Sequence, residues 1–140
     1  MLMEKRPFLP LPGIPRHFVL VPDMAGGLRG LEVARAMGLL GGESATGLAP
    51  PGLLSAVGAG RFMGVPWWQA LVRELEQAAG QPLVHVLDCG ASAPHAAMAL
   101  AQGQRMAVLA GAGRQHDAVR ALYRQEGGLL LACRPPTIGL

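Results

Sequence analysis

Five short, almost wholly apolar runs recur along this chain, and longer stretches with apolar residues at helical spacing separate them. Apolar runs without polar alternation suit strands that are buried on both faces, as in parallel sheets. Because strand and helix patterns alternate, we expect an α/β domain with a five-stranded, mostly parallel open sheet. The predicted strands are residues 17–21, 53–57, 83–87, 105–110 and 129–133.

The stretches between these runs predict four crossover helices. Helix-boundary residues support them: Ser92 is a candidate N-cap, and Gly80 follows a stripe of apolar residues. Right-handed crossovers in a flavodoxin-like or receiver-like order would place helices on both faces of the sheet. A half (β/α)₈ barrel has the same local pattern and stays open as an alternative. The predicted helices are residues 26–37, 66–79, 93–102 and 114–126.

Two segments do not fit the alternation of strands and helices. Residues 1–15 include four prolines between positions 6 and 15, which predicts an extended arm before a single α/β domain at residues 16–140. The arm's apolar residues favour packing along the domain or, alternatively, exchange with a second subunit. Residues 39–51 are rich in Gly and Pro, and they predict a loop long enough to act as a lid or binding loop.

The composition excludes a disordered chain, because hydrophobic residues make up 51% of it and charged residues only 15%. With so few charges, part of the surface must be apolar, so we expect self-association, most simply as a dimer. No apolar stretch is long enough to cross a membrane, and no N-terminal signal pattern is visible. A disulfide-stapled secreted protein would carry more than two cysteines, so we expect a cytoplasmic location.

The formal net charge is +3, and Lys5 is the only lysine among the 12 basic residues. A GC-rich, bacterial genome is the simple explanation of this arginine bias, and an anion-binding surface is the alternative. The arginines form no continuous run, and aromatic residues are only 4% of the chain. Nucleic-acid binding requires clustered cations with aromatic residues between them, so we expect no nucleic-acid partner.

Ligands of open parallel sheets bind beyond the carboxyl ends of the strands, so residues just after the predicted strands are candidate ligand-binding residues. Gly111 and Gly113 open a helix beside Arg114, where backbone amides and a guanidinium could hold a small anion. A simple strand-to-helix turn is the alternative. The full set is Asp23, Asp88, Gly111, Gly113, Arg114 and Arg134.

The candidates for catalysis follow the third predicted strand; they are Asp88, Cys89 and His95. Cys89 precedes a helix N-terminus, whose dipole would favour a thiolate, and His95 in the first turn of that helix is a candidate base. The simpler alternatives are that Asp88 caps the following turn and that Cys89 fills the core. The four histidines lack metal-ligand spacing and no nucleotide motif is complete, so we expect neither a metal nor a cofactor.

Two adjacent tryptophans stand at the start of the predicted helix at residues 66–79. Trp67 falls on the apolar stripe of that helix and is predicted to lie in the core. Trp68 is offset from it by about 100°. It suits either a partner or subunit contact, or packing under the 39–51 loop.

Asp88 ends the third predicted strand, and Arg134 with a following proline comes after the fifth. In these two positions residues 83–136 resemble the second half of a response-regulator receiver domain, where that family has a phospho-accepting Asp and a Lys-Pro pair. The family also has an acidic pair for Mg²⁺, where this chain has only Asp23, and a Ser or Thr, where this chain has Ala110. The resemblance therefore implies a similar shape rather than phosphotransfer.

Three functional hypotheses follow from the sequence. The first is a non-catalytic α/β module that binds a protein partner, itself or a small anionic ligand at the carboxyl edge of the strands. The second is a small enzyme or metabolite-binding protein that uses Asp88, Cys89 and Arg114. The third is a degenerate receiver-like signalling domain. We favour the first, because the sequence contains no complete catalytic set.

Overall fold

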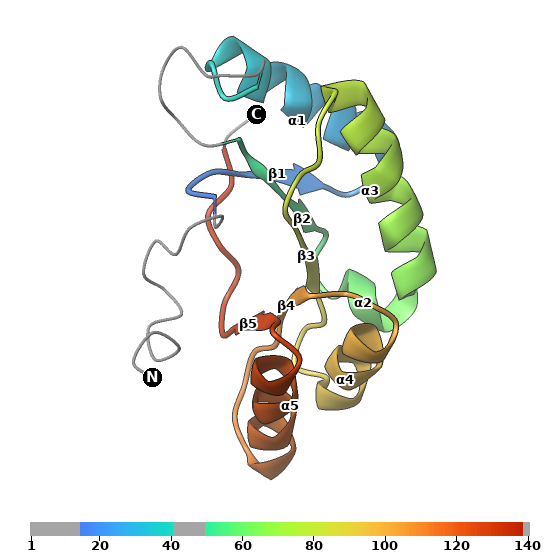
Figure 1. Ribbon diagram of the computed structural model, residues 1–140, viewed down its shortest axis with the longest axis vertical. Coiled ribbons are helices and arrows are strands. Elements are labelled where there is room, and N and C mark those ends of the chain that lie inside the picture. Colours follow the sequence, from blue (N-terminus) through green and yellow to red (C-terminus); the bar gives the residue numbers. More distant parts are fainter. Residues whose placement is uncertain (1–14, 41–49, 139–140) are drawn as a thin grey trace.

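The computed structural model describes residues 15–40 and 50–138 (Figure 1). The predicted arm, apart from Pro15, and most of the predicted 39–51 loop lie outside these residues. Within them, five strands alternate with helices as predicted, and a short helix, α2, is additional. The strands are β1 (Phe18–Val21), β2 (Gly52–Ser55), β3 (His85–Asp88), β4 (Met106–Val108) and β5 (Leu129–Leu131). The helices are α1 (Met24–Ala36), α2 (Ala59–Phe62), α3 (Val65–Ala79), α4 (Ala93–Ala101) and α5 (Arg114–Gln125).

The sheet is parallel throughout, and its strands lie side by side in the order of the sequence, β1-β2-β3-β4-β5. The predicted α/β class and the five-stranded parallel sheet are confirmed. The strand order differs from that of flavodoxin-like domains, in which β1 lies between β2 and β3. Each crossover here steps in the same direction, so the sheet has no point at which the strand order reverses.

The four longer helices pack on one face of the sheet, which corrects the prediction of helices on both faces. Leu31 of α1, Trp68 of α3, Ala96 of α4 and Tyr123 of α5 belong to one continuous core with Val19 of β1. Right-handed crossovers that all step in one direction place every helix on the same side. This is the arrangement of the half (β/α)₈ barrel, and Figure 1 shows the helices along one side of the strands.

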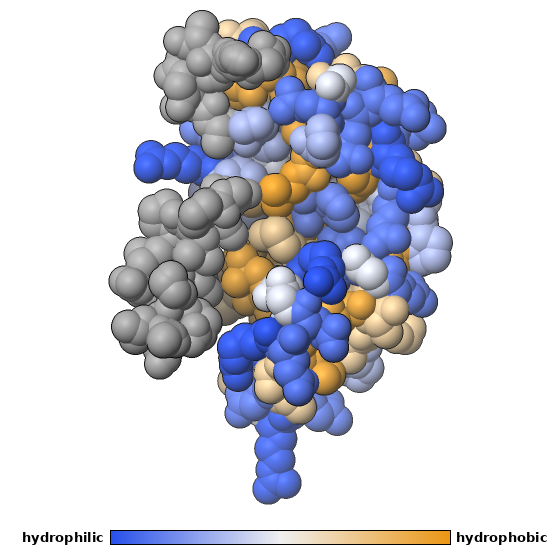
Figure 2. All heavy atoms as spheres, viewed as in Figure 1, coloured by the Kyte–Doolittle hydropathy of each residue, from blue (hydrophilic) through white to orange (hydrophobic). Residues whose placement is uncertain are grey.

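The opposite face of the sheet carries no helix among the described residues. Four strand residues on it, Phe18, Leu54, Val86 and Val108, form a second and smaller apolar cluster. After β5 the chain crosses this face as residues 132–138, which we call the strap (Figure 1). Figure 2 shows hydrophilic side chains over the helices and apolar side chains in a broken band down the middle of the view.

The strap is fixed to the sheet at three points. It leaves β5 at Leu131, Arg134 forms an ion pair with Asp88 at the end of β3, and Thr137 bridges in parallel to Phe18 of β1. The Phe18 carbonyl also accepts a 2.9 Å hydrogen bond from the backbone N–H of residue 138. The strap therefore passes from one edge of the sheet, over its middle strand, to the other edge.

The short length of the strap shows that the sheet is curled. The chain from Leu131 to Thr137 reaches about 22 Å when fully extended. In a flat sheet, the outer edge of β1 would lie five strand spacings from β5, or about 24 Å away. The two residues also lie at different heights along the strands, which lengthens the path. The sheet must therefore curve around the strap, as a section of a barrel does.

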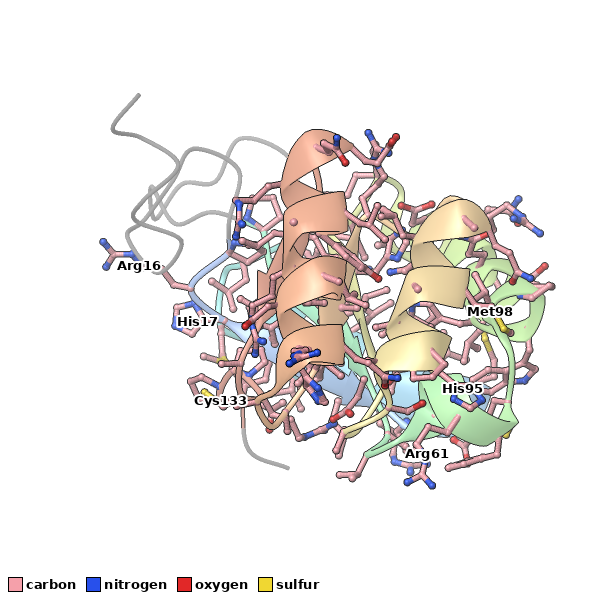
Figure 3. The ribbon with its side chains drawn as sticks, turned by 90° about the horizontal axis from the view of Figure 1, so that it is seen from below. Arg16, His17, Arg61, His95, Met98 and Cys133 are labelled. Carbon is pink, nitrogen blue, oxygen red and sulfur yellow. The ribbon has the colours of Figure 1, made fainter. Side chains whose placement is uncertain are left out.

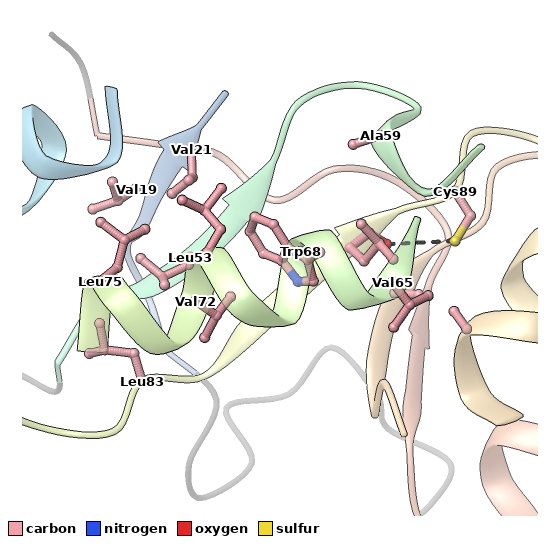
Figure 4. Packing of buried hydrophobic residues seen from close by; sticks show 14 of the residues in the cluster. Val19, Val21, Leu53, Ala59, Val65, Trp68, Val72, Leu75, Leu83 and Cys89 are labelled. Carbon is pink, nitrogen blue, oxygen red and sulfur yellow. Dashed lines mark hydrogen bonds between the residues drawn. The ribbon is translucent and has the colours of Figure 1, made fainter. Parts of the chain in front are cut away.

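Helix α3 corrects the prediction for the tryptophan pair. Trp68 is fully buried (Figure 4), so it is not available for the predicted partner contact, and Trp67 is half-buried and packs against the core. The alternative of packing under the 39–51 loop concerns residues that lie mostly outside the described ranges. The helix begins at Val65, and its buried stripe follows from that residue rather than from Trp67. The stripe consists of Val65, Trp68, Leu71, Val72, Leu75 and Ala79. Among the described residues, no helix is long and apolar enough to cross a membrane.

Candidate functional site at the carboxyl ends of the strands

Asp88 ends β3, and its buried carboxylate makes two short polar contacts. Oδ2 lies 2.6 Å from Nη1 of Arg134, and Oδ1 accepts a 2.6 Å hydrogen bond from the backbone N–H of Gly90. The backbone N–H of Asp88 donates to Oγ of Ser55, at the end of β2, at 2.9 Å. The structure thus brings together two residues that the sequence singled out, Asp88 and Arg134. Both carboxylate oxygens are engaged, and the pair holds the strap against β3.

The other predicted ligand-binding residues lie at separate strand ends. Asp23 caps α1, because its Oδ1 accepts a 2.7 Å hydrogen bond from the backbone N–H three residues later. The Gly111 carbonyl accepts a 3.2 Å hydrogen bond from an arginine of α5, and Gly113 and Arg114 are exposed at the start of that helix. No bond within the described chain joins these residues to Asp88, so the predicted set does not form one polar cluster.

Cys89 and His95 contact different residues and are not bonded to each other. Cys89 is fully buried, and its thiol lies 3.9 Å from the Leu87 carbonyl (Figure 4). Burial, and secondly the negative charge of Asp88, raise the pKa of the Cys89 thiol to about 12, so it is protonated at neutral pH. Nδ1 of His95 lies 2.5 Å from Oγ of Ser92, the N-cap of α4. No described bond joins the thiol to the imidazole.

Exposed apolar side chains gather around α2, beside these residues, and the sequence patterns above do not predict them. Val57 and Phe62 are each 68% exposed, and Met98 on the adjoining α4 is 52% exposed. Together with Met63, which is also exposed, we call these residues the α2 patch. Helix α2 packs against α4 and the end of β3, so the patch lies at the carboxyl edge of the sheet.

A groove of about 300 Å³ runs along the α2 patch. One wall consists of α2 and the start of α3, with the side chains of Phe62 and Met63. The other wall is one face of α4, with His95, Met98 and Gln102. The volume is at the lower end of the range for small-molecule pockets. The groove therefore suits a few side chains of a docked segment.

Gly60 explains why α2 exposes its large side chains. A Cβ at Gly60 would lie 2.8 Å from Sγ of Cys89 and 3.2 Å from the carbonyl oxygen of Asp88. The backbone of α2 is therefore pressed directly against the end of β3. Since this side of α2 is filled by backbone contact, Phe62 and Met63 are left on its outer side.

The rim of the groove includes one arginine and one histidine. Arg61 and His95 line it, and no Asp or Glu side chain does. Arg61 is exposed and makes no ion pair with any described residue. Figure 3 shows Arg61, His95 and Met98 on the same side of the molecule, well away from Cys133 on the strap.

No known family model, curated protein or solved structure matches this chain. Within the described ranges, no group of three His, Cys, Asp or Glu side chains is placed to hold a metal ion. The function must therefore be inferred from the residues of the site and their geometry.

The sequence did contain a signal for the α2 patch. Phe62 and Met63 are adjacent large apolar residues within a short segment that has glycines at positions 58, 60 and 64. Such a segment is too short to form a second buried stripe, so at least one of the two side chains has to face outward. The contribution of Met98 could not be predicted in this way, because α4 is apolar on nearly every side.

Proposed function

We propose that this chain is a non-catalytic protein-binding module and that the α2 patch is its contact surface. The observation that carries this proposal is the gathering of four exposed apolar side chains around one short helix. Burying apolar surface against a partner gains roughly 25 cal/mol per Å². Exposed clusters of this kind mark interaction sites, and Met and aromatic residues are enriched in protein interfaces.

The polar groups beside the patch support binding rather than catalysis. Catalysis of the acid–base or nucleophilic kind requires a group that is free to reach substrate. The Asp88 carboxylate is occupied by Arg134 and a backbone N–H, and the Cys89 thiol is buried and protonated. His95 contacts Ser92 in place of Cys89.

The partner that we propose is a different protein rather than a second copy of this chain. In a two-fold dimer both subunits would use the same patch, which would bring two Arg61 guanidinium groups into one interface. The groove lining contains no carboxylate that could offset this repulsion. Like charges that face each other across an interface act against association. We therefore favour a partner of complementary charge over the dimer that the composition predicts.

A photo-crosslinking experiment tests this function. A photo-reactive phenylalanine analogue is placed at position 62, and at position 122 in a matched variant, and both are irradiated in cells of the source organism. Leu122 is exposed on α5, which does not line the groove, so it serves as the control. We expect one discrete protein to be crosslinked from position 62 only. That protein is then purified and titrated with the unmodified chain.

The titration decides the outcome. We expect Phe62→Ser and Met98→Ser to weaken binding of the purified partner at least tenfold, and Leu122→Ser to leave it unchanged. Equal crosslinking from positions 62 and 122, or an affinity that Phe62→Ser does not alter, would contradict the proposal. A crosslink from position 62 to a second copy of the chain would identify self-association as the role of the patch.

A further inference from the structure

We propose that the groove beside α2 receives an amphipathic helix of the partner, with apolar side chains on its buried face and carboxylates at its edge. This inference rests on the proposed function, since it names the chemistry of the partner at the same surface. The shape of the groove, its apolar lining and its charge each support it.

The walls of the groove fit a helix better than an extended peptide. His95, Met98 and Gln102 repeat at three- and four-residue spacing, so they form one straight face of α4 about 10 Å long. A second helix can lie along such a face with its side chains between those of α4. An extended peptide bound by strand addition would instead require the open edge of a sheet. No strand contributes to the groove lining, and the outer edge of β1 is occupied by Thr137.

The apolar lining suits the side chains of a helix. Phe62, Met63 and Met98 line the groove, and methionine side chains are flexible and polarizable enough to adapt to different apolar shapes. Grooves of this composition take amphipathic helices through anchors at positions i, i+3 or i+4, and i+7. The volume of about 300 Å³ accommodates a few such anchors rather than a whole folded surface.

The charge of the groove determines which charged side chains the docked helix can carry along its edge. The guanidinium of Arg61 is exposed and lacks an ion-pair partner among the described residues, and His95 adds a second nitrogen base to the rim. With no acidic side chain in the lining, a docked Asp or Glu would meet the charge of Arg61 and no carboxylate. A docked Lys or Arg would meet Arg61 and be repelled.

Selection from a peptide library tests the inference. The probe is a phage-displayed library of random 16-residue peptides, selected on the immobilised full chain and depleted on the Phe62→Ser variant. We expect the enriched peptides to carry apolar residues at helical spacing and a net negative charge. We also expect their affinity for the chain to fall about thirtyfold in Phe62→Ser. Leu122→Ser is the matched surface control and should bind as the wild type does.

A second variant tests the charge separately. Arg61→Gln should weaken the selected peptides by up to about fivefold, as for an exposed ion pair, and should make their binding less sensitive to salt. Phe62 and Arg61 are both exposed, so neither change threatens the fold, which circular dichroism can verify.

Each result of the selection has a definite meaning. Enriched peptides that need Phe62 but are basic, or that lack helical spacing, would overturn this inference and leave the proposed function standing. Peptides that bind equally well to Phe62→Ser, or a selection that enriches nothing, would overturn both. Helical, acidic peptides that lose affinity in Phe62→Ser and in Arg61→Gln would support both.

Discussion

Nη1 of Arg134 lies 2.6 Å from Oδ2 of Asp88, and this contact joins the strap to the middle strand of the sheet. The Asp88 side chain is only 3% exposed and that of Arg134 is 28% exposed. A carboxylate at this depth is stable as a charge only while a cation and hydrogen-bond donors compensate it. The pair is therefore part of the architecture, because it holds a segment of chain across the face that carries no helices.

We expect Arg134→Gln to lower the free energy of unfolding by about 2–4 kcal/mol, because the change leaves a buried carboxylate without its cation. Urea unfolding at neutral pH measures the difference. Arg73→Gln is the matched control, since Arg73 is exposed on α3, and it should change stability by less than about 0.5 kcal/mol. An Arg134→Gln variant as stable as the control would contradict the structural role of the pair.

Gly30 lets α1 approach β1 closely, so Gly30→Ala should destabilise the protein. An added Cβ would lie 2.2 Å from Cγ1 of Val19, a distance at which one of the two elements must shift. We expect a loss of about 1–3 kcal/mol in thermal or urea unfolding, as for other overpacked cores. Val19→Ala should recover part of this loss in the double variant, because it removes the clashing methyl group. Strict additivity of the two changes would argue against the clash.

His85 should make the stability of the protein depend on pH. Burial lowers the pKa of His85 below its ordinary 6.5, and the nearby Glu76 carboxylate offsets part of that effect. The unfolded chain therefore takes up a proton at this residue more readily than the folded chain. The contribution of neutral His85 to the free energy of unfolding is therefore complete above about pH 6.5, and it is lost as the pH falls below that value. Urea unfolding at several pH values between about 7.5 and 5 measures this loss of stability. The range brackets the ordinary histidine pKa of about 6.5.

The His85→Gln variant isolates this contribution. Nδ1 of His85 lies 3.2 Å from Nε2 of the buried Gln104, and a glutamine side chain can replace that contact without titrating. We expect the variant to lose less stability than the wild type on acidification. Gln115→Ala, at an exposed position of α5, changes no titratable group, so it is the matched control and should keep the wild-type dependence. A slope that is the same in all three proteins would assign the acid sensitivity to other groups.

The two cysteines should differ sharply in reactivity. Cys89 is buried with its thiol pKa raised to about 12, whereas Cys133 is exposed on the strap. A thiol reagent such as iodoacetamide at pH 8 should therefore modify Cys133 in the folded protein and both cysteines after denaturation. The Cys133→Ser variant should remain unmodified until it unfolds. Rapid modification of Cys89 in that folded variant would contradict this prediction and would support a role of Cys89 as a nucleophile.

Local patterns were enough to predict the class of the fold. The five apolar runs became five parallel strands, and the four periodic stretches became the four longer helices, because burial on both faces and helical spacing leave direct marks on sequence. The order of the strands in the sheet could not be predicted from such local patterns. Whether a crossover steps to the left or right of the preceding strand depends on how the whole sheet packs, so the single helical face could not be predicted.

The candidate site was predictable only in part. Asp88 and Arg134 stood out because each follows a predicted strand, and parallel strands end at the same edge. That they bind each other could not be read from sequence, since it depends on where the strap crosses. The α2 patch was missed because α2 has only four residues, too few for a periodic signal.

The strap also determines when the sheet can be completed. Within the described residues, the pairings among β1 to β5 all join neighbours in the sequence, so each can form as soon as the next strand has been made. The contact between Phe18 and Thr137 joins segments from near the two ends of the described chain, and it requires a long loop to close. Among the described residues, only the strap pairs with the outer edge of β1, so this pairing is missing while β2 to β5 are being translated. An unpaired edge can add a strand of another chain, and the strap finally occupies this edge at Phe18.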